Sequence, residues 1–482
     1  MRAKIPGRGI DKQELLDTMR GYRAGDADWK AGRTWSLVYF AGPEHHELLR
    51  EAHALFFAEN ALNPMAFKSL KRMEAEIVQM AASLLNGPAS AVGTVTSGGT
   101  ESILMAVKAA RDRARQRRPW IRQPQIVAPR SIHVAFEKAA HYFGLDIRYA
   151  DLGPEMRADV SALERLVTRN TVLIAASAPQ YPHGVIDPIA EIGALAQRKK
   201  IPFHVDACVG GFLLPWIERL GRPLPQFDFR IPGVTSMSAD LHKYGFAAKG
   251  ASVLVYRDMS YLRHQFFVAT EFPGGVYASP SMPGTRPGGP IAAAWAALMA
   301  LGEEGYLEHT RRALTATDAL RTGLEAIPEL KLVAPPDATL VAWATRDPSV
   351  NLYAIADRLD DAGWTTDRQH KPASIHCTVT SNHSGVIDAY LADVRAAVDY
   401  VKSHPEAVAR GNAPMYGMMA KIPFRGMVRQ GVMKVMEQMY GPEGSADLDS
   451  ATRSGWLGKV MDKYGGTLDR LLDRLPSARR ER

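Results

Sequence analysis

Cysteine is scarce in this chain of 482 residues, which contains only Cys208 and Cys377. Two cysteines give neither a disulfide framework nor the ligand spacing of a metal site, so we expect no bound metal and a reducing, cytoplasmic compartment. Long apolar runs are also absent, since the longest, Ile291 to Leu301, falls short of the roughly 20 residues that span a bilayer. The basic residues at the start are not followed by the apolar core of a signal peptide. We therefore expect no transmembrane segment.

The common nucleotide-binding fingerprints are missing as well. The chain has no GxxxxGK[ST] and no GxGxxG, which argues against a P-loop and a dinucleotide site. Its net charge is +8, with basic clusters at Arg111 to Arg122 and Ser477 to Arg482. Neither cluster carries a nucleic-acid motif, so we interpret them as a solvated helix face and a terminal segment. Nucleic acid is not an expected partner, whereas peripheral contact with an anionic membrane stays open.

Short β-branched runs alternate with helical stretches through the middle of the chain. Strands that are apolar at nearly every position, separated by helices, predict an α/β fold with a mostly parallel central sheet and helices on both faces. The segment Phe272 to Pro290, which is rich in Gly and Pro, is expected to be a loop before a long helix. The strand runs are Gln125 to Ala128, Thr171 to Ala176, Phe203 to Asp206 and Ser252 to Tyr256.

Changes in this pattern divide the chain into three parts. Residues 1–60 are an N-terminal segment with short helical patterns, and 61–325 form a large domain. Residues 326–482 form a smaller C-terminal α/β domain, which opens with strand patterns at Leu330 to Val333 and Thr339 to Ala344. It ends in a methionine-rich helical tail.

Two residues point to one cofactor. Asp206 ends the apolar run Phe203-His204-Val205-Asp206, and Lys243 lies in the stretch SADLHKYG, Ser238 to Gly245. Pyridoxal phosphate needs a lysine amine for its Schiff base and a carboxylate that keeps its ring nitrogen protonated. Considered separately, each residue has an ordinary interpretation: Asp206 as a cap of the turn after a strand, and Lys243 and the nearby Lys249 as surface lysines. Together they predict a pyridoxal phosphate enzyme, with burial lowering the pKa of both lysines.

Two further motifs gain meaning beside this pair. In SGGTES, Ser97 to Ser102, consecutive glycines open directly onto a helix, which suits a phosphate seat or an ordinary helix cap. His133 follows a predicted strand, where an imidazole stacks on a cofactor ring or simply caps the next helix.

Taken together, these motifs resemble the sphingosine-1-phosphate lyase family, which belongs to the pyridoxal phosphate-dependent decarboxylase group with the fold-type I architecture. The resemblance runs from about Trp35 to Gly441. The blocks that carry it are NPMAFKSLKRMEAEIV (63–78), TSGGTESILMA (96–106), SAPQYPHGVIDPIAEI (177–192), HVDACVGGFLLPW (204–216), SMSADLHKYGFAAKGASVLVY (236–256) and APMYGMMAK (413–421).

The resemblance implies a homodimer whose active sites use residues of both subunits. It assigns Lys243 as the Schiff-base lysine, Asp206 as the partner of the pyridine nitrogen and His133 as the residue stacked on the ring. Tyr39 and Lys249 fall where the family recognises the substrate phosphate and carries out catalysis. Contacts to the cofactor phosphate are assigned to Gly99, Thr100 and His242, and the loop Gly284, Thr285 and Arg286 reaches it from the partner subunit.

The chain departs from the family pattern at two places. Where the family has Asn-Pro-Leu-His-Pro, this chain reads Asn60-Ala61-Leu62-Asn63-Pro64, so Asn63 replaces a histidine expected near the substrate phosphate. Asparagine donates a hydrogen bond but carries no charge, which predicts weaker phosphate affinity or a different substrate. Leu37 also stands where relatives tend to have a small residue.

The implied activity is carbon–carbon bond cleavage. A lyase of this family breaks the Cα–Cβ bond of a phosphorylated long-chain base in a retro-aldol step, releasing a fatty aldehyde and phosphoethanolamine. The alternative on the same scaffold is an amino-acid decarboxylase, which would need a cation for the substrate carboxylate. A catalytically silent scaffold is a third hypothesis, and the intact Lys243 and Asp206 argue against it.

Overall fold

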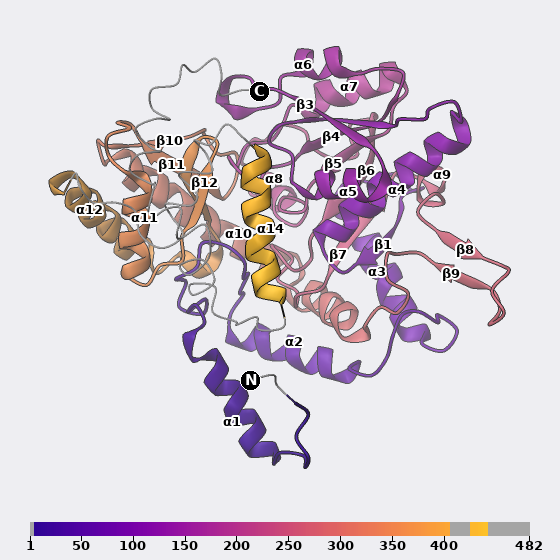
Figure 1. The fold of residues 1–482 in the computed structure, drawn as a ribbon, viewed down its shortest axis with the longest axis horizontal. Coiled ribbons are helices and arrows are strands. Elements are labelled where there is room, and N and C mark those ends of the chain that lie inside the picture. The colour runs from indigo at the N-terminus through magenta and orange to yellow at the C-terminus, as the bar shows by residue number, and fades with distance from the viewer. Residues whose placement is uncertain (1–3, 405–424, 442–482) are drawn as a thin grey trace.

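The computed structural model describes residues 4–404 and 425–441 (Figure 1). Its centre is a seven-stranded sheet in the order β1-β7-β6-β5-β4-β2-β3. All neighbouring pairs from β3 to β6 are parallel, and β7 runs antiparallel to both β6 and β1. The prediction of a mostly parallel sheet is therefore confirmed. The strands are β1 Val92–Thr96, β2 Gln125–Pro129, β3 Asp146–Ala150, β4 Thr171–Ser177, β5 Phe203–Asp206, β6 Val234–Ala239 and β7 Ser252–Tyr256.

Helices cover both faces of this sheet, and successive residues of β4 show it. Ile174 and Ala176 pack into one apolar core with α3, α7, α8 and α10. Leu173 and Ala175 point the other way, into a core shared with α4 and α5. Alternation along a strand that is buried on both faces explains why β4 reads as a continuous apolar run. These helices are α3 Lys68–Leu84, α4 Gly99–Arg117, α5 Ala135–Phe143, α7 Ile189–Lys199, α8 Leu214–Arg219 and α10 Gly288–Glu325.

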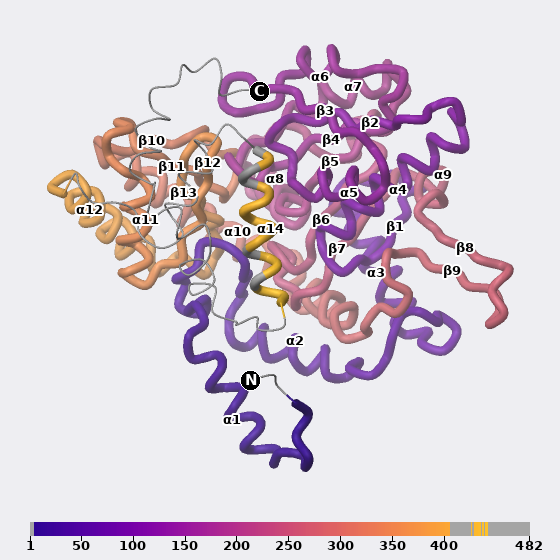
Figure 2. Tube along the Cα trace, in the orientation of Figure 1, coloured from indigo at the N-terminus to yellow at the C-terminus, as the bar shows by residue number. Residues whose placement is uncertain are grey.

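A smaller unit follows the long α10 and lies to the left in Figures 1 and 2. Its four-stranded sheet, in the order β10-β11-β13-β12, is antiparallel and has its own apolar core with α11 and α12. A bidentate ion pair between Arg157 and Asp337, with a shortest N–O distance of 2.6 Å, ties it to the large unit. The elements are β10 Leu330–Leu332, β11 Leu340–Thr345, α11 Leu352–Asp361, β12 Asp367–His370, β13 Ala373–Thr378 and α12 Ile387–Ser403.

The remaining elements lie at the periphery. The segment Phe272 to Pro290, expected to be a loop, contains the strand β9 Tyr277–Ser279. This strand pairs with β8 Phe267–Ala269, and the resulting hairpin projects away from the body in Figure 1. Of the predicted helical tail only α14, Arg425–Tyr440, belongs to the described residues, and the block 413–421 lies outside them. None of the described helices is long and apolar enough to cross a bilayer. The other helices are α1 Lys12–Tyr22, α2 Pro43–Leu55, α6 Val160–Leu166 and α9 Met259–Leu262, with 3-10 turns at Arg23–Gly25, Pro154–Met156 and Ser381–His383.

Candidate active site

The topology brings Asp206 and Lys243 together at one edge of the sheet. Asp206 is the last residue of β5 and pairs in register with Ser238 of the neighbouring parallel strand β6. Lys243 follows the end of β6 by four residues, so both side chains lie at the carboxyl ends of adjacent strands. They line a cavity of about 420 Å³, together with Gly99, Thr100, His133 and His242.

The Asp206 carboxylate is held in place from two sides. Its Oδ1 accepts hydrogen bonds from the Cys208 amide at 3.1 Å and the Ser238 hydroxyl at 3.3 Å. Two residues earlier, His204 is hydrogen-bonded to Ser236 and Ser238, and burial lowers its pKa to about 4, so its imidazole is neutral. The Asp206 side chain is therefore fixed in position at this end of β5.

The pKa of Lys243 differs from the value expected from the sequence. Burial is the largest single influence and lowers the pKa of Lys243, but the Asp240 carboxylate, 2.9 Å from Nζ, together with smaller contributions from Cys208 and Tyr39, raises this pKa above its ordinary value. The prediction of a lowered pKa was wrong for this lysine, because it did not include an ion pair within the same turn. Asp240 is also a site residue that the sequence reasoning missed. Its signal was a carboxylate three positions before the lysine.

For Lys249 the predicted shift is confirmed. Burial and the charge of Lys243 lower its pKa to about 8. Its Nζ donates to the His242 carbonyl at 3.2 Å and lies 5.3 Å from the centre of the Tyr39 ring. Burial raises the pKa of Tyr39 to about 12, so its phenol stays protonated at neutral pH. The site thus pairs a lysine that titrates near neutrality with a phenol that does not.

The start of α4 has the features of a phosphate seat. A Cβ on Gly99 would lie 2.7 Å from the Cys208 sulfur and 2.8 Å from Asp240 Oδ2, so only glycine fits there. Glu101 accepts hydrogen bonds from the Ser97 amide at 2.7 Å and from the Met282 amide at 2.9 Å, which fixes the turn before the helix. The fixed turn presents the first-turn N–H groups, with their positive potential, to the cavity. The chemistry and shape of this pocket therefore fit pyridoxal phosphate.

Two histidines border this seat. Burial lowers the pKa of His242 to about 4, and its Nδ1 accepts from the Ala251 amide at 3.2 Å, so a neutral ring faces the seat. His133 lines the cavity, and its Nδ1 accepts from the Ala135 amide at 3.2 Å at the start of α5. His133 is thus placed both to cap α5 and to meet a ring in the cavity.

Tyr181 also lines the cavity and was not singled out from the sequence. Its hydroxyl donates to Asp367 of β12 at 2.9 Å, and its ring centre lies 4.3 Å from that of His376. The only sequence signal was its position shortly after the end of β4. Because its contacts come from the small unit, this residue links that unit to the cavity.

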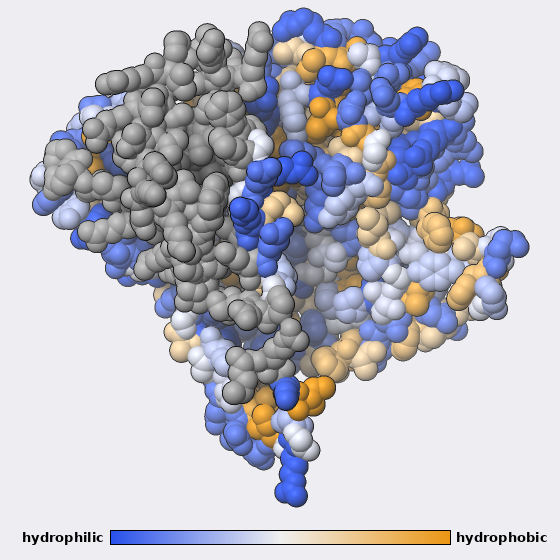
Figure 3. Space-filling model, in the orientation of Figure 1, coloured by the Kyte–Doolittle hydropathy of each residue, from blue (hydrophilic) through white to orange (hydrophobic). Residues whose placement is uncertain are grey.

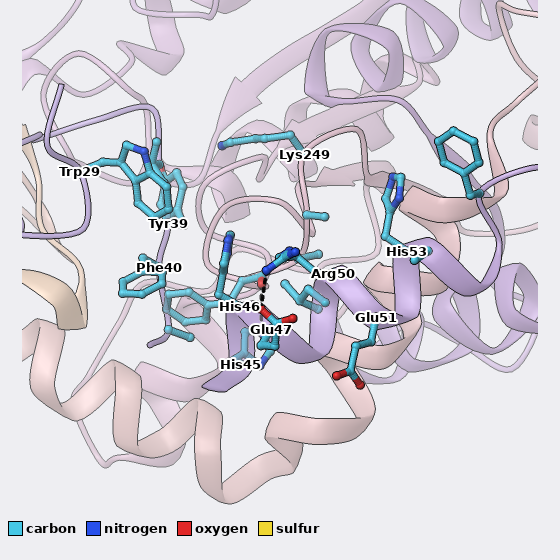
Figure 4. A pocket seen from close by; sticks show the side chains of 18 residues that line it. Trp29, Tyr39, Phe40, His45, His46, Glu47, Arg50, Glu51, His53 and Lys249 are labelled. Atoms are coloured by element: carbon cyan, nitrogen blue, oxygen red, sulfur yellow. Dashed lines mark hydrogen bonds and ion pairs between the residues drawn. The ribbon is translucent and has the colours of Figure 1, made fainter. Parts of the chain in front are cut away.

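A second, largely apolar cavity of about 660 Å³ adjoins Tyr39 and Lys249. Figure 4 shows Lys249 reaching across it toward Tyr39 and Trp29, opposite the side chains of α2. Both residues are coupled electrostatically to Lys243, which relates this cavity to the cofactor pocket. Its aromatic lining comes from Trp29, Tyr39, Phe40, Phe57 and Phe246.

Leu37, two residues from Tyr39, has a left-handed backbone. Its φ is 69°, a conformation that glycine adopts without cost and leucine rarely adopts, and its side chain is exposed. This backbone favours glycine over leucine at the position.

Seven predicted residues do not line the cofactor cavity of the same chain: Tyr39 and Lys249, which line the second cavity, and five others. Asn60 Oδ1 accepts from the Leu62 amide, and Asn63 Oδ1 from the Met65 amide, so both side-chain oxygens stabilise a local turn. Gly284 and Thr285 are not brought to the pocket either. Arg286 is buried in a bidentate ion pair with Glu74, at 2.6 and 3.2 Å. In this chain its guanidinium is bound to Glu74, and the role assigned to Arg286 at the substrate, like that of the 284–286 loop in a partner's site, stays a prediction.

Comparison with known proteins agrees with this geometry. Residues 38–346 match the model of the pyridoxal-dependent decarboxylase conserved domain. Sphingosine-1-phosphate lyase 1 of Rattus norvegicus is 43% identical over 442 residues, which cover 91% of this chain and 77% of the relative. The chain belongs to the sphingosine-1-phosphate lyase family. The lyase of Arabidopsis thaliana is 41% identical, covering 90% of this chain and 81% of that protein.

Solved structures give the same result. A sphingosine-1-phosphate lyase from Burkholderia pseudomallei superposes with a TM-score of 0.80 at 40% identity, covering 84% of this chain and 94% of that one. Glutamate decarboxylase of Lactobacillus brevis reaches a TM-score of 0.73 at 22% identity, covering 83% and 95%, which shows the shared fold alone. The fold-type I architecture and the pyridoxal phosphate cofactor expected from the sequence are thereby confirmed.

Proposed function

We propose that this enzyme cleaves the Cα–Cβ bond of sphingosine 1-phosphate, or of a related phosphorylated long-chain base, to a fatty aldehyde and phosphoethanolamine. The observation that carries the proposal is the placement of Lys243 and Asp206 at adjacent strand ends, in a chain that matches lyases of this name over most of its length. The amino-acid decarboxylases it resembles share the fold at much lower identity.

The residues of the pocket have different roles in this reaction. When bound, pyridoxal phosphate supplies an electron sink for the bonding pair released at Cα. Asp206 holds a proton at the ring nitrogen, Lys243 provides the attaching amine, and the start of α4 binds the phosphate. A retro-aldol step also needs a group that takes the proton of the β-hydroxyl. Lys249, with a pKa of about 8, exists in both protonation states near neutral pH and can either accept this proton or bind an anion.

The second cavity suits the hydrocarbon chain of such a substrate. It adjoins Tyr39 and Lys249, and Phe40, Phe57 and Phe246 contribute to its apolar lining. A pocket with an apolar wall and a few convergent polar groups at one end matches an amphiphilic ligand. We propose that the chain of the substrate lies here while its polar end faces Lys249 (Figure 4).

A homodimer and a cytoplasmic location complete the proposal. The hairpin β8-β9 exposes Phe267, Val268, Phe272 and Val276, and Figure 3 shows apolar surface on this projecting arm. Exposed apolar side chains on a projecting arm favour contact with a second subunit. Such a dimer would provide the partner loop 284–286, and both free, buried cysteines are compatible with a reducing compartment.

The products distinguish the two candidate reactions. Incubation with sphingosine 1-phosphate is expected to release a long-chain aldehyde and phosphoethanolamine in equal amounts, whereas a panel of L-amino acids should release no carbon dioxide above background. The opposite result, carbon dioxide without aldehyde, would show that the enzyme is a decarboxylase. If the holoenzyme released neither aldehyde nor carbon dioxide, the proposed activity would be refuted.

The pH dependence should reveal Lys249. Because its pKa in the free enzyme is about 8, the cation that attracts the substrate phosphate is present below pH 8 and is lost above it. We expect kcat/KM to fall by about tenfold per pH unit on the alkaline side. In Lys249→Arg the charge persists, so the decline of kcat/KM should move to higher pH. In Lys249→Met no cation is present at any pH, so kcat/KM should be lower throughout and should lack this decline. An alkaline limb that is identical in wild type and Lys249→Arg would assign it to another group.

A further inference from the structure

Asp240 is a buried carboxylate in the cofactor pocket to which none of the roles above applies. It directly follows β6, and its side chain is only 2% exposed. Oδ2 lies 2.9 Å from Lys243 Nζ and 3.6 Å from His242 Nε2. Oδ1 has no hydrogen-bond partner among the described residues. Half of this carboxylate is therefore buried without a donor, which is costly unless something else binds there.

The carboxylate lies beside the phosphate seat. A Cβ on Gly99, the first residue of α4, would be 2.8 Å from Oδ2 and 2.9 Å from Oδ1. A phosphate bound at the first-turn N–H groups would thus have Asp240 as a close neighbour. Two anions that share one buried site repel each other, and the usual result is that one of them binds a proton.

Lys243 is the only cation that compensates Asp240 at ion-pair distance among the described residues. The neighbouring His242 is neutral because burial lowers its pKa to about 4, and burial keeps the Cys208 thiol protonated by raising its pKa. Lys249 and Tyr39 interact with Asp240 over a longer range. Burial by itself raises the pKa of Asp240, but nearby positive charge, that of Lys243 first, and a hydrogen bond from Ser252 hold this pKa below its ordinary value. Once the lysine amine bonds to the cofactor, Asp240 no longer has the Lys243 ammonium as its partner.

We propose that cofactor binding is coupled to the uptake of one proton by Asp240, which then donates a hydrogen bond from its neutral carboxyl group to the cofactor phosphate. The proton comes from solvent, the one bond formed is the O–H of Asp240, and no electrons are transferred. In the cofactor-free protein the same carboxylate instead holds the Lys243 ammonium beside the seat. This inference depends on the cofactor and not on which substrate the enzyme takes.

Infrared difference spectroscopy of the full chain, with and without pyridoxal phosphate, tests the protonation directly. Binding should produce a carboxylic-acid carbonyl band in wild type that is absent in Asp240→Asn. The matched control is Asp159→Asn, which makes the same exchange at the N-cap of α6, outside the cofactor cavity, and it should keep the band. A wild-type spectrum without the band overturns the proposal even if the variants do not fold. A band that persists in Asp240→Asn overturns it as well.

Cofactor affinity supplies an independent readout. The amide of Asp240→Asn can still donate to the phosphate, so it should bind pyridoxal phosphate with nearly wild-type affinity at neutral pH. Asp240→Ala lacks a donor and should bind about tenfold more weakly or worse. Equal dissociation constants for Asp240→Ala and Asp240→Asn would contradict the hydrogen bond. Both measurements use cofactor binding alone, so they stand apart from the aldehyde assay that tests the proposed reaction.

Discussion

Replacing Lys243 with alanine is expected to abolish aldehyde release, with a loss of turnover of at least about 10³-fold. Among the residues that the structure describes, the variant removes the only lysine that lines the cofactor cavity, at the strand ends beside Asp206. The visible absorption band of the lysine-bound cofactor should disappear at the same time, although free pyridoxal phosphate can still occupy the start of α4. Turnover and the absorption spectrum, measured on the same sample, check this result.

A matched lysine separates this effect from a general loss of stability. Lys331 is exposed on β10 of the small sheet, and Lys331→Ala should retain both the band and the activity. Undiminished aldehyde release from Lys243→Ala would show that the reaction does not need this amine. That outcome would refute the assignment of the site.

Replacing Asp206 with asparagine is expected to lower kcat by about 10²- to 10³-fold, in line with the removal of one preorganised electrostatic group. The amide keeps an oxygen that can accept from the Cys208 amide and the Ser238 hydroxyl, so the local structure should persist. What it loses is the negative charge that keeps a proton on the cofactor ring nitrogen. Steady-state kinetics with cofactor content measured in parallel will show whether the loss is in turnover rather than in cofactor binding.

The control for this variant is Asp159→Asn. Asp159 caps α6 away from the cavity, where its side chain accepts from the Ser161 and Ala162 amides. Asparagine is an equally good N-cap, so activity should not change. A full rate in Asp206→Asn would show that the ring nitrogen needs no anionic partner in this enzyme.

The strands of the central sheet that the sequence predicted share one property. β2, β4, β5 and β7 are buried at every position, because helices pack on both faces, and most of their residues are therefore apolar. The central strands that the sequence analysis missed have more polar or exposed positions. β3 is an edge strand with exposed positions, β1 contains Gly93, and β6 contains buried serines whose hydroxyls bond to His204. These strands could not be predicted from their composition, because hydrogen bonds to their polar side chains form only in the tertiary structure.

The site divides in the same way. Lys243, Asp206 and the glycines before α4 could be predicted because each lies in a short local motif that ends a strand or begins a helix. The raised pKa of Lys243 could not be predicted, because it depends on how the turn after β6 places Asp240. Arg286 had the sequence context of a ligand, yet the fold pairs it with Glu74, which is 212 residues away in the chain.

The chain by itself therefore determined the fold class and the cofactor and led to the two residues that we assign to its chemistry, because periodic burial and the requirements of an imine-forming amine appear locally in the sequence. Only the tertiary structure decided the charge states and the partners of the polar groups. Electrostatic energies depend on distances of a few ångströms between residues that the sequence does not place, and on how far water is excluded from them.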